Sequence, residues 1–246
     1  MNHFTSLAII FLALFLLTSA NFKVDKSIGV QTIIDKSIRV HGGDKVANGH
    51  FSFDFRKHSF TYKRKAGKYI YTRTHKETGI KDILTNEGIK RMDGSQEVVL
   101  SEKQKKGYSN SVNSVQYFAF LPYFLNDEAV NKELIGESEI KGKYYYKIKV
   151  TFEQEGGGDD HEDTYMYWID KEDFSLDYLA YSYLINGGGV RFRAAYNTRI
   201  VDGVTFQDYI NYKHDKTTPV ESLDVLYANN DLKELSKIVL ENVKSL

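Results

Sequence analysis

The feature that most limits how this chain can fold is the alternation of aromatic and polar residues along short segments. Residues 51–56 read Phe-Ser-Phe-Asp-Phe-Arg, which places three aromatic rings on one face of a strand and three polar side chains on the other. Glycine or Asp-Gly turn signals follow about every ten residues, the spacing of an antiparallel meander. The first half of the chain therefore predicts a meander, with further strands at 60–62, 69–73, 80–84, 89–92 and 97–100.

Longer strands are predicted in the second half, and they carry large aromatic residues on both faces. Within 164–170, Met166 and Trp168 lie opposite Tyr165 and Tyr167. A curved sheet with a covered inner side would explain this pattern and would enclose a ligand cavity. The alternative is that the rings form only core and cross-strand pairs. The strands concerned are 144–152, 164–170, 176–184, 190–197 and 204–212.

Three segments show helical spacing instead. Residues 24–40 carry Val and Ile at roughly helical intervals and end at a Gly-Gly pair that can cap a helix. Residues 109–126 form an amphipathic, aromatic pattern broken by Pro122, and a short helix is expected over 128–132. Residues 221–246 mix helical and strand signals. The predicted fold class is mainly β (α+β): a curved antiparallel sheet or incomplete β-barrel with an N-terminal helix and a mid-chain helical lid.

The N-terminus has the layout of a secretory signal peptide. The apolar run from Leu7 to Leu17 is 11 residues long, and a helix of that length is well short of a ~30 Å hydrocarbon core. Small residues precede a cleavage point after Ala20. The alternative is an uncleaved N-terminal anchor, because no Lys or Arg precedes the run. We expect a signal peptide over 1–20, a single domain over 21–246, and a periplasmic or secreted protein.

Composition excludes several classes of function. The 246 residues contain 33 Lys and Arg against 33 Asp and Glu, so the formal net charge is zero. Nucleic-acid binding normally needs a basic excess, and no nucleic-acid partner is expected. The chain has no Cys, which excludes disulfides, thiolate zinc sites and a lipid anchor on cysteine. No transmembrane segment is expected after signal cleavage.

The chain also lacks the motifs of common enzyme classes. No Gly-Lys-Ser/Thr follows the glycine runs, no G-x-G-x-x-G follows a predicted strand, and neither G-x-S-x-G nor H-E-x-x-H is present. No catalytic residue and no resident cofactor are therefore predicted, and an enzymatic activity is not favoured.

An acidic segment follows three glycines and is the sharpest local feature. Asp159, Asp160, His161 and Asp163 are candidate ligands for Ca²⁺ or another divalent cation, because hard cations prefer clustered oxygen donors. The spacing is not that of an EF-hand. The alternative is a solvated hairpin tip, or one whose carboxylates pair with arginines on a neighbouring strand.

Other residues are candidates for binding a ligand inside a cup. The histidine and aspartate of the HGGD segment form one pair, although this segment can equally be a helix C-cap. Three arginines could hold an anion, or could pair with internal carboxylates. Three aromatic residues could line an apolar cavity. The full set is His41, Asp44, Arg56, Tyr117, Phe118, Trp168, Arg191 and Arg193.

The meander brings distinctive loops to one end of the sheet. Consecutive antiparallel strands place alternate loops at the same end. The loops at 155–163, 185–189 and 213–219 are therefore predicted to share one rim. Arg191 and Arg193 are two residues apart and should lie on one face of their strand.

Four segments together resemble an uncharacterised family of exported bacterial proteins. They are HGGD at 41–44, FSFDFR at 51–56, EGGGDDHEDTYMYW at 155–168 and GGGVRFRAAYN at 187–197. The architecture this resemblance implies is similar to that of the periplasmic lipoprotein carriers and receptors of the localisation pathway, in which helices cover an incomplete barrel that holds acyl chains. The resemblance implies a fold and not a cargo.

These observations lead to three hypotheses. The first is an exported protein that holds a lipophilic or amphipathic molecule or an acyl chain in a half-barrel cavity, as an envelope lipid or lipoprotein carrier would. The second is a secreted metal-dependent enzyme that uses the acidic segment 159–163. The third is a structural envelope module without a small ligand.

Overall fold

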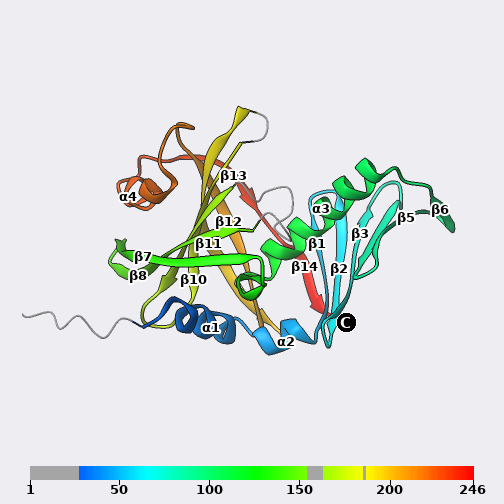
Figure 1. Ribbon diagram of the computed structural model, residues 1–246, viewed down its shortest axis with the longest axis horizontal. Coiled ribbons are helices and arrows are strands. Elements are labelled where there is room, and N and C mark those ends of the chain that lie inside the picture. The colour runs from blue at the N-terminus through cyan, green and yellow to red at the C-terminus, as the bar shows by residue number, and fades with distance from the viewer. Residues whose placement is uncertain (1–27, 154–162, 185–186) are drawn as a thin grey trace, which may run out of the picture.

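The chain folds into two antiparallel sheets that are joined where one strand continues into the next (Figure 1). The computed structural model describes residues 28–153, 163–184 and 187–246. The first sheet has seven strands in the order β14-β1-β2-β3-β4-β5-β6. The second also has seven, in the order β13-β12-β11-β10-β9-β8-β7. Neither sheet closes into a barrel within the described residues, so the predicted open, mainly β fold is confirmed.

The first sheet contains β1 (His50–Phe55), β2 (His58–Lys65), β3 (Lys68–His75), β4 (Lys81–Thr85), β5 (Gly88–Asp93), β6 (Gln96–Val98) and β14 (Glu241–Ser245). The second contains β7 (Val130–Ile140), β8 (Lys143–Phe152), β9 (Thr164–Asp170), β10 (Leu176–Tyr183), β11 (Gly189–Val201), β12 (Val204–Lys213) and β13 (Lys233–Ile238). The helices are α1 (Val30–Val40), α2 (Gly43–Ala47), α3 (Glu102–Ala119), η1 (Tyr123–Asn126), η3 (Val220–Ser222) and α4 (Leu223–Ala228).

Two connections hold the sheets together. The C-terminal strands β13 and β14 follow one another through Val239 and Leu240, and they lie at the edges of the second and first sheets respectively. The other connection is the crossover from β6 through α3 and η1 to β7. In Figure 1, α3 runs diagonally across the strands of the first sheet to the junction of the two sheets. It is therefore the mid-chain helical cover that the sequence predicts.

The helix α3 begins at a capping box that the sequence prediction missed. The Ser101 side chain accepts a hydrogen bond from the Gln104 backbone, and the Gln104 side chain accepts one from the Ser101 backbone. Because this pair satisfies backbone donors at the first turn, the helix starts at Glu102 and not at 109. It ends at Ala119, before Pro122, so the expected helix over 109–126 is two elements, α3 and η1.

The two sheets bury different numbers of faces. In the first sheet, burial alternates, and Phe51, Phe53, Phe60, Tyr62 and Tyr71 pack with α3 in one core. In the second sheet, six of the seven residues of β9 are buried. The second sheet therefore has a hydrophobic core on each side. Its aromatic residues form core pairs, as one alternative predicts, and its inner side is covered, as the other predicts.

Separate elements cover the two faces of the second sheet. We call the face of the second sheet that packs against α1 and α3 the inner face. There, Tyr165 and Tyr167 pack with Ile33 and Ile34 of α1. On the outer face, Met166 and Trp168 pack with η3 and α4. The predicted opposition of these two pairs of β9 residues is confirmed.

Several predicted elements were wrong in kind or extent. Residues 128–132 were expected to be helical, but β7 starts at Val130 and pairs along its length with β8. The N-terminal helix begins at Val30 because Gly29 is extended, and α2 follows it before β1. The ambiguous C-terminal region forms η3, α4, β13 and β14. The expected signal peptide over 1–20 lies outside the described residues.

Candidate ligand cavity between the sheets

A cavity of about 230 Å³ lies at the junction of the two sheets, under α3. Its wall comes from the end of β1 and the turn that follows it, from α3, β11 and β12, and from the end of β13 and the link to β14. Because these elements are distant in the sequence, only the assembled fold creates the cavity. Its lining residues are Phe55, Arg56, Ser114, Val115, Phe118, Ala119, Arg193, Gln207, Tyr209, Ile238 and Leu240.

The helix α3 supplies four of these side chains from one face. Ser114, Val115, Phe118 and Ala119 are spaced by three and four residues, the separation of neighbours on a helix surface. The adjacent residue Gln116 is fully buried and donates a hydrogen bond from Nε2 to the Thr61 carbonyl of β2, at 2.9 Å. This bond fixes the rotation of α3 against the first sheet.

Arg193 enters the cavity from the inner face of β11. Its Nη2 atom donates a hydrogen bond to the Tyr181 hydroxyl at 3.0 Å. The guanidinium carbon lies 4.5 Å from the centre of the Phe118 ring and 5.1 Å from that of Tyr181. Phe192 and Ala194, on the opposite side of the strand, belong to the outer core. The predicted facing of Arg191 and Arg193 is thus confirmed.

Arg56 contributes a second cation. Phe55 pairs with His58, so Arg56 and Lys57 form a two-residue hairpin turn. Arg56 has a φ of 55°, in the left-handed region, as such turns require. Its guanidinium carbon lies 5.0 Å from the centre of the Phe55 ring. Among the described lining residues there are two arginines and no carboxylate.

Tyrosine side chains lie near the guanidinium group of Arg193. Tyr209 lines the cavity and donates a hydrogen bond to Gln207 at 3.2 Å. Tyr167 is buried in the inner core, and Tyr117 is partly buried against it with its hydroxyl buried. Burial raises the pKa of Tyr117, Tyr167 and Tyr209 above the ordinary value, and the nearby Arg193 lowers that of Tyr167 and Tyr209 by a smaller amount. All three phenols are therefore neutral at physiological pH.

The structure brings three of the predicted ligand residues together in the cavity: Arg56, Phe118 and Arg193. Tyr117 lies next to them in the core, with its ring 6.0 Å from that of Phe118. Arg191 lies on the same face as Arg193 but outside the lining. Its Nη1 atom donates to the Val190 carbonyl at 2.8 Å, and its guanidinium lies over Tyr183.

Three other candidates lie elsewhere. Trp168 is on the outer face of the second sheet, where its Nε1 atom donates to Asp224 at 3.1 Å. Asp44 is in the first turn of α2. His41 caps the end of α1, as the alternative interpretation of its segment predicts, although α2 follows it instead of a strand.

His41 has a structural environment. Its Nδ1 atom is 2.8 Å from the Ser37 carbonyl, which can only accept, so Nδ1 carries the proton. Its Nε2 atom then accepts a hydrogen bond from the Leu176 backbone at 3.4 Å. Burial lowers the pKa of His41 and outweighs the effect of the bond to Ser37. The ring is neutral and ties α1 to the start of β10.

The predicted metal ligands come from the acidic segment 159–163. Asp159, Asp160 and His161 lie outside the described residues. Asp163 is described and is buried directly before β9. Among the described residues, no group of three or more His, Asp or Glu side chains could hold a metal ion.

The strand register places the described flanks of the predicted rim together. Tyr181 pairs with both Tyr165 and Arg191, and Arg191 pairs with Lys213. These ends of β9, β10, β11 and β12 therefore lie at the same end of the second sheet, while residues 154–162 and 185–186 of the predicted rim lie outside the described residues. Sequence reasoning missed lining residues on β1, α3 and β12, and also Ile238 and Leu240, which fall in the region of mixed signals. Their apolar spacing alone could not place them opposite α3.

Solved structures share this fold at very low sequence identity. A LolA superfamily protein from Nitrosomonas europaea aligns with a TM-score of 0.52 and 10% identity, over 89% of this chain and 94% of that one. A DUF1329 family protein from Desulfovibrio piger gives 0.51 and 12%, over 89% and 94%. A domain described as an outer membrane lipoprotein-sorting protein from Vibrio parahaemolyticus gives 0.51 and 6%, over 88% and 93%.

No functionally curated protein matches the chain. Within the described part of the molecule, no helix is both long enough and apolar enough to cross a lipid bilayer. A sequence family described as "Family of unknown function (DUF6503)" matches residues 6–241. Since that match spans most of the 246 residues, the chain belongs to the DUF6503 family, and its fold is similar to that of a LolA superfamily protein.

Proposed function

We propose that this protein is an exported carrier that holds the aliphatic part of a lipid or acylated molecule in the cavity between its two sheets. The expected signal peptide over residues 1–20 supports export to the periplasm or beyond. The single observation that carries the proposal is the cavity itself, which opens under a helix and has a mostly apolar wall.

The chemistry of the wall supports an aliphatic ligand. Phe55, Val115, Phe118, Ile238 and Leu240 supply side chains without strong hydrogen-bonding groups. Removing apolar surface from water stabilises a complex by roughly 25 cal/mol per Å², and concave apolar sites with few polar groups are typical of small-molecule binding. A hydrophobic cavity of this kind favours a ligand with a hydrocarbon chain.

The fold adds support of a weaker kind. One solved structure with this architecture is described as a lipoprotein-sorting protein domain. At 6% identity, that description applies to the other protein, and similarity of fold alone does not transfer a ligand. It does make a lipid or acyl group the first ligand class to examine.

The direct test is binding of a fluorescent fatty acid, parinaric acid, together with mass spectrometry of gently purified protein. We expect saturable binding and a co-purified lipid. The matched variants are V115W and N113W, on the same helix. Val115 lines the cavity, so an indole there fills the space, whereas Asn113 is exposed.

The expected result is loss of at least about ten-fold in affinity for V115W, with N113W unchanged and both variants retaining the far-ultraviolet circular dichroism of the parent. Absence of any bound lipid and of parinaric acid binding by the parent protein would overturn the proposal. Equal binding by V115W and the parent would move the site away from this cavity.

A further inference from the structure

We infer that the cavity selects amphiphiles with an anionic head group, such as a carboxylate, and that Arg193 binds this group. This inference rests on the proposed function, because it names the class of ligand that the same cavity would take. It comes from the charge and the unused hydrogen-bonding capacity of the cavity wall.

Arg193 has bonding capacity that the described chain leaves unused. A guanidinium has five N–H donors. One of these reaches the Tyr181 hydroxyl, while Nε is buried and has no hydrogen-bond partner in the described structure. The aromatic faces of Phe118 and Tyr181 stabilise the positive charge but accept no strong hydrogen bond.

Three other partly buried arginines in the two sheets are neutralised by carboxylates. Arg73 and Arg91 both bind Asp82, at 2.6 and 2.7 Å, and Arg199 binds Asp208 at 3.1 Å. Within the described part of the chain, no carboxylate lies within ion-pair distance of Arg193. Since buried charges are normally paired, an anion from a ligand is the partner that this position lacks.

The remaining wall favours a chain attached to that anion. The described lining residues include two cations and no carboxylate, so an anionic group is attracted and a cationic group is repelled. The cavity holds about 230 Å³, less than the roughly 300–1,000 Å³ of sites for drug-sized ligands. A single hydrocarbon chain fits this volume better than a diacyl lipid does.

Arg191 provides a matched control. It is two residues from Arg193 on the same face of β11, but it is not part of the cavity wall and donates to its own neighbour's carbonyl. A general effect of removing positive charge from this strand should appear in both variants. A specific head-group contact should appear only at Arg193.

The experiment is calorimetric titration of the full mature protein with decanoate, decanol and acetate, in R193Q, R193K and R191Q as well as the parent. We expect the parent and R191Q to bind decanoate at least about ten-fold more tightly than decanol, since hydrogen bonds to charged groups contribute roughly 1.5–3 kcal/mol. R193Q should lose this preference while keeping its affinity for decanol. R193K should retain part of it.

Each other outcome has a distinct meaning. Equal binding of decanoate and decanol by the parent overturns the inference and leaves the proposed function intact. A preference that R193Q retains, or that R191Q loses equally, also overturns it. Tight binding of acetate shows a small-anion site, which contradicts an amphiphile site. Failure of both ten-carbon ligands to bind contradicts the inference and the proposed function together.

Discussion

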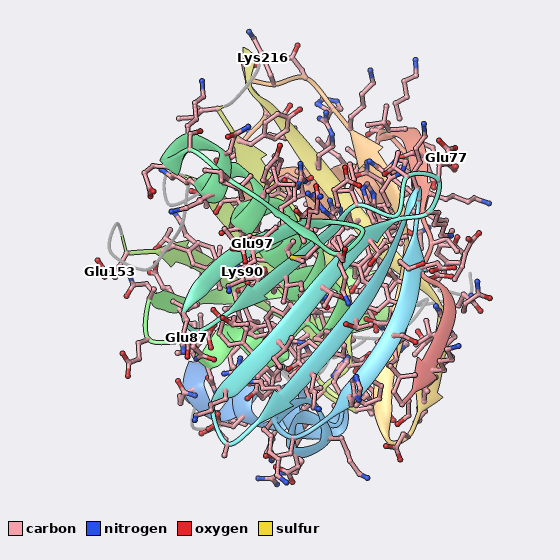
Figure 2. The ribbon with its side chains drawn as sticks, turned by 90° about the vertical axis from the view of Figure 1, so that its right-hand side faces the viewer. Glu77, Glu87, Lys90, Glu97, Glu153 and Lys216 are labelled. Carbon is pink, nitrogen blue, oxygen red and sulfur yellow. The ribbon has the colours of Figure 1, made fainter. Side chains whose placement is uncertain are left out.

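The two sheets of this protein bury their faces differently. In the first sheet, the face that packs against α3 carries the apolar core residues, whereas most of the other face is exposed. Figure 2 looks onto that exposed face, where Glu87, Lys90 and Glu97 project near one edge and Glu77 at the opposite end. In the second sheet, both faces are covered, by α1 and α3 on one side and by η3 and α4 on the other.

This difference shows where a ligand can be held. The outer face of the second sheet is filled by the chain's own residues, with Trp168 and Phe192 in contact with α4. The cavity instead occurs where the inner faces of both sheets meet under α3. Aromatic residues on both faces of the second sheet therefore indicate that other elements pack on both faces. Only the inner face borders the cavity.

The largest expected effect on stability concerns the outer face of the second sheet. Trp168→Ala should lower the free energy of unfolding by about 3–5 kcal/mol, because it empties a fully buried site and removes the hydrogen bond to Asp224. Urea unfolding measures this loss. The matched change in the first sheet is Ile70→Ala, where the side chain is 46% exposed. It should cost less than about 1 kcal/mol, and similar losses in both variants would contradict the contrast between the sheets.

The next prediction concerns a buried carboxylate in the first sheet, which is covered on one face only. Asp82 is 2% exposed and accepts hydrogen bonds from Arg73 and Arg91. Replacing it with Asn leaves two guanidinium groups without their partner and should cost about 3 kcal/mol in urea unfolding.

The same carboxylate should contribute to acid sensitivity. Burial alone would raise the pKa of Asp82, but hydrogen bonds from Arg91 and Arg73 outweigh burial and hold it below the ordinary value. Its contribution is therefore present above the unfolded pKa of about 3.9 and is lost as pH falls through the lower folded pKa. Identical acid-unfolding curves for D82N and the parent would contradict this assignment.

A smaller, pH-dependent effect is expected at His41, which ties α1 to the second sheet. Its folded pKa is lowered by burial, so the unfolded state binds the proton more tightly. Stability should fall as pH decreases below about 6.5, with a slope of at most about 1.4 kcal/mol per pH unit. H41Q should flatten this dependence between pH 7 and 5.5 in urea titrations. If H41Q leaves the pH dependence of the free energy of unfolding unchanged, this dependence comes from another titratable group.

The smallest effect concerns an exposed ion pair. The Lys90 ammonium lies 3.5 Å from Glu97, and its side chain is 65% exposed (Figure 2). Lys90→Ala should change the free energy of unfolding by less than about 0.5 kcal/mol, because water and salt screen exposed pairs. A loss comparable to that of D82N would show that exposure does not separate these two interactions.

Much of the architecture could be predicted from periodicity. The alternation at 51–56 and along 164–170 placed strands and faces correctly, since a strand's facing depends only on local geometry. The start of α3 could have been found from Ser101 and Gln104. The strand β7 could not, because its register depends on pairing with β8 and its own sequence carries three Glu residues.

The cavity was only partly predictable. Arg56, Phe118 and Arg193 were identified by residue type and facing. Trp168 has the same chemistry as a cavity residue but points to the other face, where α4 covers it. Which face of a two-sided sheet borders a cavity depends on the path of distant elements, and Leu240 illustrates this because the C-terminal link carries it to the cavity from the end of the chain.

The most direct test of the central account is paramagnetic broadening of methyl resonances by a spin-labelled fatty acid bound to the protein. The account predicts broadening of the methyl groups of Val115, Ile238 and Leu240, which line the cavity. The methyl groups of Val190, Val220 and Leu223, on the outer face of the second sheet, should remain sharp. Broadening confined to the outer set, or no broadening in either set, would contradict a ligand site between the two sheets.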